Sequence, residues 1–140
     1  MVLQIPSTVT FDRDGKSVDL AISCHQNDSE VLELCRKASS EMGKAIFRKV
    51  WIIDSEGSGL LPGILEAERL APYVWYENAE HNLGAAGNLE RRLECCAESG
   101  AKWVFAVNHD GEIDFDVVKK LHQTGELTNA AAVYPPRKLP

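Results

Sequence analysis

Four short apolar runs alternate along the chain with segments whose apolar residues recur at helical spacing, and this alternation restricts the fold more than any other feature. The runs at 18–24, 50–53, 73–76 and 103–107 predict buried strands, and 130–134 predicts a fifth. The segments between them predict helices at 27–43, 62–71, 88–100 and 115–122. Strands that alternate with helices in this way predict an α/β fold, with a mostly parallel, Rossmann-like sheet in three α/β/α layers.

The expected ends of the first helix come from its flanking residues. Asn27 and Glu30 have the spacing of a capping box, in which each side chain bonds a free backbone amide at the helix start. Gly43 is expected to end the helix, because glycine readily adopts the left-handed backbone of a helix terminus. Met42, one residue earlier, falls on the apolar face of the same helix.

Burial of the large side chains follows from their positions in these elements. Trp51, Trp75 and Trp103 lie inside predicted strands, so we expect them to pack in the core. Arg91 and Arg92 lie on the helix predicted from residue 88, and both are expected to face solvent.

Composition narrows the class of protein. The chain has 140 residues, enough for one domain with one core, and its net charge of -6 argues against binding nucleic acid through a basic face. No apolar stretch approaches membrane-spanning length, and residues 1–10 lack the basic start of a signal peptide, so we expect a cytoplasmic protein. The four cysteines lack metal-ligand spacing and are expected to be buried free thiols: Cys24, Cys35, Cys95 and Cys96.

Polar residues follow each of the first four predicted strands. In a doubly wound sheet, ligands bind beyond the carboxyl ends of the strands, so these residues are the candidates for a site. They are His25, Gln26 and Asn27 after the first strand, 54–56 after the second, Glu77, Asn78, His81, Asn82 and Gly84 after the third, and 108–110 after the fourth. The sequence therefore predicts one polar rim above an apolar sheet.

The segments that carry these residues resemble, in order and spacing, those of family 2 glycosyltransferases. They are VDLAISCHQND, VWIIDSEGS, HNLGAAGN and WVFAVNHDGEID, the last two being the most specific. The resemblance covers residues 18–135. It implies a GT-A-type domain that binds a nucleotide-sugar and is too short to hold the whole enzyme. The β-prone residues and turn chemistry of 1–17 predict a hairpin or arm before this domain, and the proline-rich residues 136–140 predict a tail after it.

The resemblance also implies roles for particular residues. Asp54 would hydrogen-bond the nucleotide base, and Cys24, His25 and Gln26 would line the base and ribose. From the later segments, Asn82 and Gly84 would approach the nucleotide, Asn108 would bond a ribose hydroxyl, and Asp110 would ligate Mg²⁺ or Mn²⁺. A hard divalent cation of this kind stabilises the charge of a departing diphosphate.

Two departures from the family pattern leave the function open between two classes. The D-x-D motif begins here with Asn108, which adds no charge, and no carboxylate can be assigned as general base. The first class is a domain that binds donor for transfer of a hexose-type sugar to an unknown acceptor, incomplete for catalysis alone. The second is a non-catalytic interaction module that keeps the fold and self-associates as a homo-oligomer.

Overall fold

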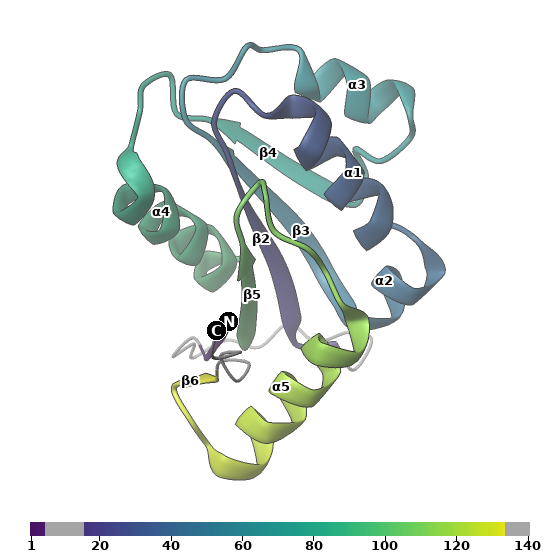
Figure 1. The fold of residues 1–140 in the computed structure, drawn as a ribbon, viewed down its shortest axis with the longest axis vertical. Helices are drawn as coiled ribbons and strands as arrows, with labels where there is room; N and C mark the ends of the chain where they lie inside the picture. The colour runs from purple at the N-terminus through teal and green to yellow at the C-terminus, as the bar shows by residue number, and fades with distance from the viewer. Residues whose placement is uncertain (5–15, 134–140) are drawn as a thin grey trace, which may run out of the picture.

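A computed structural model of the chain describes residues 1–4 and 16–133. These residues form an α/β fold around one six-stranded sheet with strand order β4-β3-β2-β5-β1-β6 (Figure 1). The elements in chain order are β1 (Val2–Gln4), β2 (Val18–Cys24), α1 (Asp28–Ala38), α2 (Glu41–Ile46), β3 (Phe47–Asp54), α3 (Leu61–Ala67), β4 (Val74–Asn78), α4 (Gly84–Glu98), β5 (Trp103–Val107), α5 (Phe115–Thr128) and β6 (Ala132–Val133).

The predicted mostly parallel sheet is confirmed. Strands β4, β3, β2 and β5 run parallel to one another, whereas β1 pairs antiparallel with both β5 and β6. Val2–Gln4 was predicted to belong to a hairpin or arm, but it is a strand inside the main sheet, and Val2 is fully buried. The rest of the predicted hairpin, over 5–15, lies outside the described residues, as does the predicted tail.

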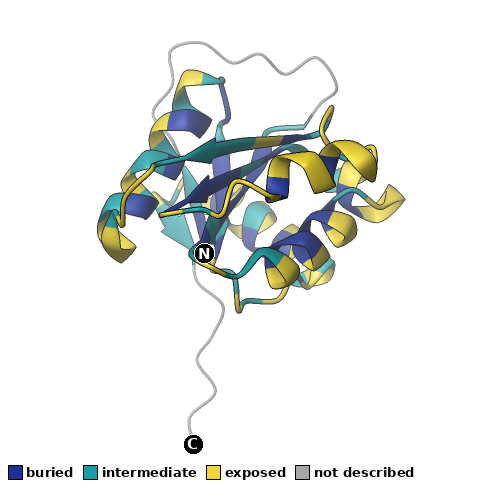
Figure 2. Ribbon diagram, turned by 90° about the horizontal axis from the view of Figure 1, so that it is seen from above, coloured by how far each residue is buried: buried dark blue, intermediate teal, exposed yellow. Residues whose placement is uncertain are grey.

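Alternate residues of the strands pack into two clusters on opposite faces of the sheet. Residues of α1, α3 and α5 join the larger cluster, with Leu20, Ile22 and Ile52 from the strands. Cys96 of α4 joins the smaller one with Ala21 and Val104. Buried residues accordingly follow the strands and the inner sides of the helices, as Figure 2 shows. The expected three-layer, GT-A-type arrangement stays a prediction.

The first predicted helix is divided in two, which corrects the expectation for 27–43. Helix α1 ends at Ala38, and Ser40 begins α2 by accepting a hydrogen bond from the backbone amide of Gly43 at 3.3 Å. Gly43 is therefore inside a helix instead of ending one. Asn27 precedes α1 as expected, but its side chain makes no capping hydrogen bond. Met42 is 56% exposed, because the break turns it away from the core.

The burial predicted for three large side chains is confirmed in one case and wrong in two. Trp103 is buried as expected, but Trp75 on the edge strand β4 is 49% exposed, since α4 packs mainly on β2, β3 and β5. Arg92 is buried, not solvated, and α4 begins at Gly84, four residues before the predicted start.

The cysteines and helices match two expectations from composition. All four cysteines are buried free thiols. Among the helices of residues 16–133, none combines the length and apolar character needed to cross a membrane.

Candidate functional site

A pocket of about 370 Å³ lies at the carboxyl ends of the parallel strands, against the first turn of α4. Because β3, β2 and β5 are adjacent and parallel, the loops that follow them meet at one edge of the sheet. The lining comes from these loops and from α4: Ser23, Cys24, His25, Ser55, Asn82, Gly84, Ala85, Asn88, Arg92, Asn108, His109 and Asp110.

Six of the eight residues predicted from the sequence line this pocket. They are Cys24, His25, Asn82, Gly84, Asn108 and Asp110. Gln26 and Asp54 do not. Gln26 is exposed in the turn after β2, where its backbone has a φ of 57°. The rim predicted from the strand ends is therefore one pocket, without these two side chains.

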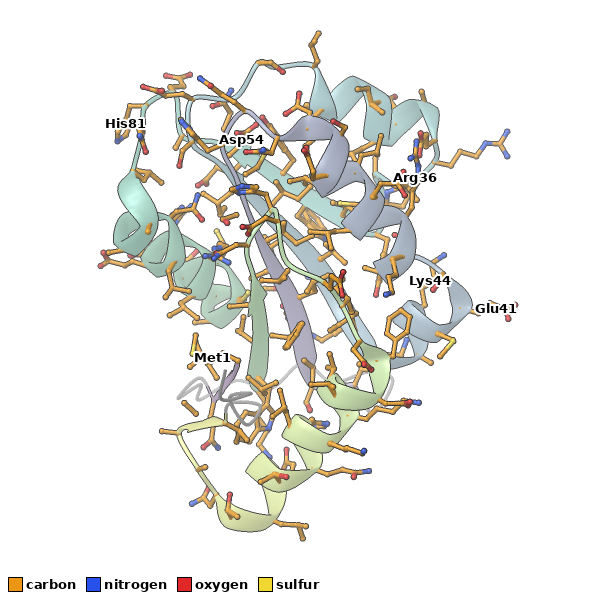
Figure 3. The ribbon with its side chains drawn as sticks, in the orientation of Figure 1. Met1, Arg36, Glu41, Lys44, Asp54 and His81 are labelled. Carbon is orange, nitrogen blue, oxygen red and sulfur yellow. The ribbon has the colours of Figure 1, made fainter. Side chains whose placement is uncertain are left out.

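Asp54 is turned away from the pocket and is fully buried. Side chains alternate along a strand, so Asp54 points to the face covered by α1, while Ser23 and Ser55 face the pocket near α4. The hydroxyl of Tyr76 donates to Asp54 Oδ2 at 2.6 Å. Figure 3 shows Asp54 beside the start of α1, and His81 in the loop that leads into α4.

Two buried side chains of α4 form the floor of the pocket. Arg92 donates from Nη1 to the carbonyl oxygens of Ala21 and Val107, both at 3.1 Å, and so joins the middle of β2 to the end of β5. Asn88 donates to the carbonyl of Ile53 at 2.9 Å. Neither side chain is fully satisfied by the described residues, since Asn88 Oδ1 and Arg92 Nε have no hydrogen-bond partner. Burial lowers the pKa of Arg92 to about 10, so the guanidinium keeps its charge at neutral pH.

The first turn of α4 adds an anion-binding element. Its leading amides have no partner within the helix, and its N-cap residue, Leu83, makes no capping hydrogen bond. Gly84 opens the helix with a φ of 71°, a conformation that L side chains rarely adopt, and its amide donates to Asn82 Oδ1 at 2.9 Å. Gly84 and Ala85 both line the pocket. The positive end of a 15-residue helix therefore lines the same pocket as Arg92.

The loop after β2 is held against the loop after β3. His25 Nδ1 lies 2.8 Å from the carbonyl oxygen of Ser55. A carbonyl only accepts, so Nδ1 carries the hydrogen and Nε2 is the other ring nitrogen able to meet a ligand. Gln26 and Glu56 in these two loops have φ near 57° and 55°, an uncommon conformation for residues other than glycine.

The expected Mg²⁺ or Mn²⁺ site has one carboxylate. Asp110 is the single acidic residue in the pocket lining drawn from residues 16–133. Asn108 Oδ1 already accepts a hydrogen bond from Ser23 at 3.3 Å. Mg²⁺ is often held by one or two carboxylates together with substrate phosphates and water. The pocket thus fits an ion that enters with a phosphate substrate better than an ion held by the protein alone.

A second pocket of about 350 Å³ lies between α4 and the edge of the sheet formed by β3 and β4. Trp51 and Trp75 stack there with ring centroids 5.8 Å apart, and Lys49 Nζ lies 5.2 Å from the centre of the Trp75 ring. The pair Arg91–Glu77 closes one side of it, with Nη2 and Oε1 2.6 Å apart. We call this surface the tryptophan groove.

No protein-family model matches the chain, and no curated protein matches it either.

The pocket also contains residues that sequence reasoning missed. Ser23 lies one residue before the end of the strand predicted at 18–24 and could have been included on position alone, whereas Ser55 was among the residues predicted for the rim. Asn88 and Arg92 could not be predicted in this way. The helical pattern of the sequence does not indicate which polar side chains of the helix donate hydrogen bonds to the carbonyl groups of the strands.

Proposed function

We propose that the chain is a nucleotide-sugar-binding domain of the GT-A glycosyltransferase type, and that its pocket holds the diphosphate of the donor. The observation that carries this proposal is the buried Arg92 in a pocket that is also lined by the first turn of α4. Helix N-termini and guanidinium groups both bind phosphate in many proteins. The resemblance in four ordered segments supplies the class of ligand.

The surrounding residues fit the rest of such a ligand. Asn82, Asn108 and the free nitrogen of His25 offer hydrogen bonds suited to ribose hydroxyls and base edges. Asp110 would supply one carboxylate to a Mg²⁺ or Mn²⁺ ion that arrives with the diphosphate. Transfer of the sugar also needs an acceptor and a general base, which we assign to no described residue.

Isothermal titration calorimetry with UDP, GDP and dTDP, each with and without Mn²⁺, tests the proposal. We expect heat of binding with at least one of them, and stronger binding with the ion present. Absence of heat with all three at millimolar concentration contradicts it.

A matched pair of variants locates the binding. Ala85 lines the pocket and Ala86 does not, yet both are exposed in the first turn of α4. An acid in this turn favours the helix in either case. Ala85→Asp should therefore remove nucleotide binding through charge repulsion, whereas Ala86→Asp should bind as the wild type does. Equal behaviour of the two variants would place the ligand elsewhere.

The tryptophan groove favours a second candidate, the self-associating interaction module. Strand β4 is an edge of the sheet, and a half-exposed tryptophan on such an edge is typical of a surface that another chain covers. In this second candidate, two copies meet through β4 and bury Trp75.

A further inference from the structure

Three potential metal ligands converge from three elements on the α1 side of the sheet. Cys24 ends β2, Asp28 begins α1 and Asp54 ends β3. Each offers one donor atom, and these atoms lie within 4.8 Å of one another. The group shares Cys24 with the lining of the pocket at the carboxyl ends of the strands, which we call the phosphate pocket. The two carboxylates lie outside that lining.

The hydrogen bonds from hydroxyl groups occupy one oxygen of each carboxylate and leave the other oxygen of each without a hydroxyl donor. Tyr76 donates to Asp54 Oδ2 at 2.6 Å, and Ser58 donates to Asp28 Oδ2 at 2.8 Å. The other oxygen of Asp28 has only the thiol of Cys24, at 3.8 Å. Asp54 is fully buried, and its Oδ1 atom has no hydrogen-bond partner among the described residues.

The buried Oδ1 atom of Asp54 would be stabilised by a positively charged partner. Within residues 1–4 and 16–133, neither Asp28 nor Asp54 forms an ion pair with lysine, arginine or histidine. A buried carboxylate without a counter-charge is costly, and proteins commonly pair such groups or use them to bind metal ions. Hydroxyl donors that orient the outer oxygens are also what surrounds carboxylate ligands in metal sites.

We propose that Cys24, Asp28 and Asp54 bind a zinc ion. A thiolate with two carboxylates matches the ligand preference of Zn²⁺, whereas Mg²⁺ and Mn²⁺ avoid sulfur. As the ion binds, the Cys24 thiol releases its proton to solvent and Sγ takes up the coordination bond. Three protein ligands leave a fourth tetrahedral position for water on the side of Asp28, which is the most exposed of the three.

This site is separate from the ion expected at Asp110 and does not depend on nucleotide binding. Its ligands would join β2, α1 and β3 behind the phosphate pocket, and so stabilise the wall that carries Cys24 and His25. It also gives Asp54 a role other than the hydrogen bond to a base that the resemblance implies.

Titration of the metal-free protein with Co²⁺, followed by absorption spectroscopy, tests the proposal. A cobalt ion in this site should give a thiolate-to-cobalt charge-transfer band in the near ultraviolet, and Zn²⁺ should abolish the band by displacement. Mg²⁺ in excess should leave it unchanged. Zn²⁺ should also raise the melting temperature.

Variants separate this site from adventitious binding at a thiol. Cys24→Ser should lose the band. Asp28→Asn should lose it too, and because this residue is partly exposed, the variant should fold and test the site even if Cys24→Ser does not fold. Cys95→Ser alters a thiol near the tryptophan groove and should keep the band, as should Ala85→Asp. A wild-type protein without the band, or a band that survives both ligand substitutions, would overturn the zinc site, whatever the result with nucleotides.

Discussion

Asp19 and Glu77 each receive two hydrogen bonds from an arginine, but at very different depths. Asp19 is fully buried in β2, accepts from Nε and Nη2 of Arg48 at 2.9 and 2.8 Å, and also accepts from Trp51 Nε1. Glu77 is paired with Arg91, and both side chains are slightly more than a third exposed. Burial raises the pKa of Asp19, whereas Arg91 holds the pKa of Glu77 below its usual range.

Depth should decide what each pair contributes to stability. We expect Asp19→Ala to lower the free energy of unfolding by about 3–5 kcal/mol, because it leaves Arg48 and Trp51 with unpaired buried donors. Glu77→Ala removes a solvent-screened pair and should cost less than about 1 kcal/mol. Urea unfolding of both variants measures the difference, and similar losses in the two would contradict this account of the buried pair.

The site residues that the sequence identified are those whose position alone decides their place. Cys24 ends a parallel strand, and His25 and Asn108 directly follow such strands, whose carboxyl ends must meet at one edge. The direction of Asp54 depends on which face each alternate residue takes, and that is set by helices far along the chain. The burial of Arg92 depends on the carbonyls of two strands, which the helical pattern does not reveal.

At the level of single elements, Gly43 lets α2 pack closely on the end of α1. A Cβ atom built on it would lie 2.0 Å from the backbone oxygen of Ala38, which has no freedom to rotate away. Gly63 lies in α3 with open space where its Cβ would be. Gly43→Ala should therefore destabilise the protein by about 2–3 kcal/mol, through forced movement of packed backbone.

The same substitution in α3 provides the control. Gly63→Ala should stabilise the protein by about 0.5–1 kcal/mol, because alanine is the better helix former and meets no other atom. Thermal unfolding followed by circular dichroism gives both values. If Gly43→Ala proves as stable as the wild type, the close approach of α1 and α2 is wrong.

Strands were easier to predict than helix ends. Each apolar run from residue 18 to residue 107 became a strand, because buried parallel strands need continuous apolar residues. The division of the first helix was missed, although Ser39 and Ser40 in its middle are residues that favour helix starts over helix interiors. The apolar residues keep their helical spacing across the break, and this spacing alone does not show that the helix axis changes direction.

For the whole molecule, the least predictable feature is the antiparallel side of the sheet. Strand β1 comes first in the chain yet pairs with β5 and β6, which lie a hundred and more residues later. Such pairing depends on which sheet edge is free once the parallel strands have assembled. A short segment like Val2–Gln4 carries no local sign of that choice.

The state of association separates the two candidate functions. If the tryptophan groove is an interface, multi-angle light scattering should find a dimer that Trp75→Glu converts to a monomer. Trp75 is about half exposed, so the substitution should leave the fold intact. A wild-type protein that stays strictly monomeric at high concentration would remove the interaction module from consideration.

The central claim is that the ends of the parallel strands and the start of α4 form one pocket for a nucleoside diphosphate. Amide chemical-shift mapping with UDP and Mg²⁺ on the ¹⁵N-labelled protein tests it most directly. We predict the largest shifts at Gly84 and Ala85 and in the loops after β2 and β5, with little change around Trp75. Shifts that gather at the tryptophan groove, or no shifts at millimolar UDP, would contradict the claim.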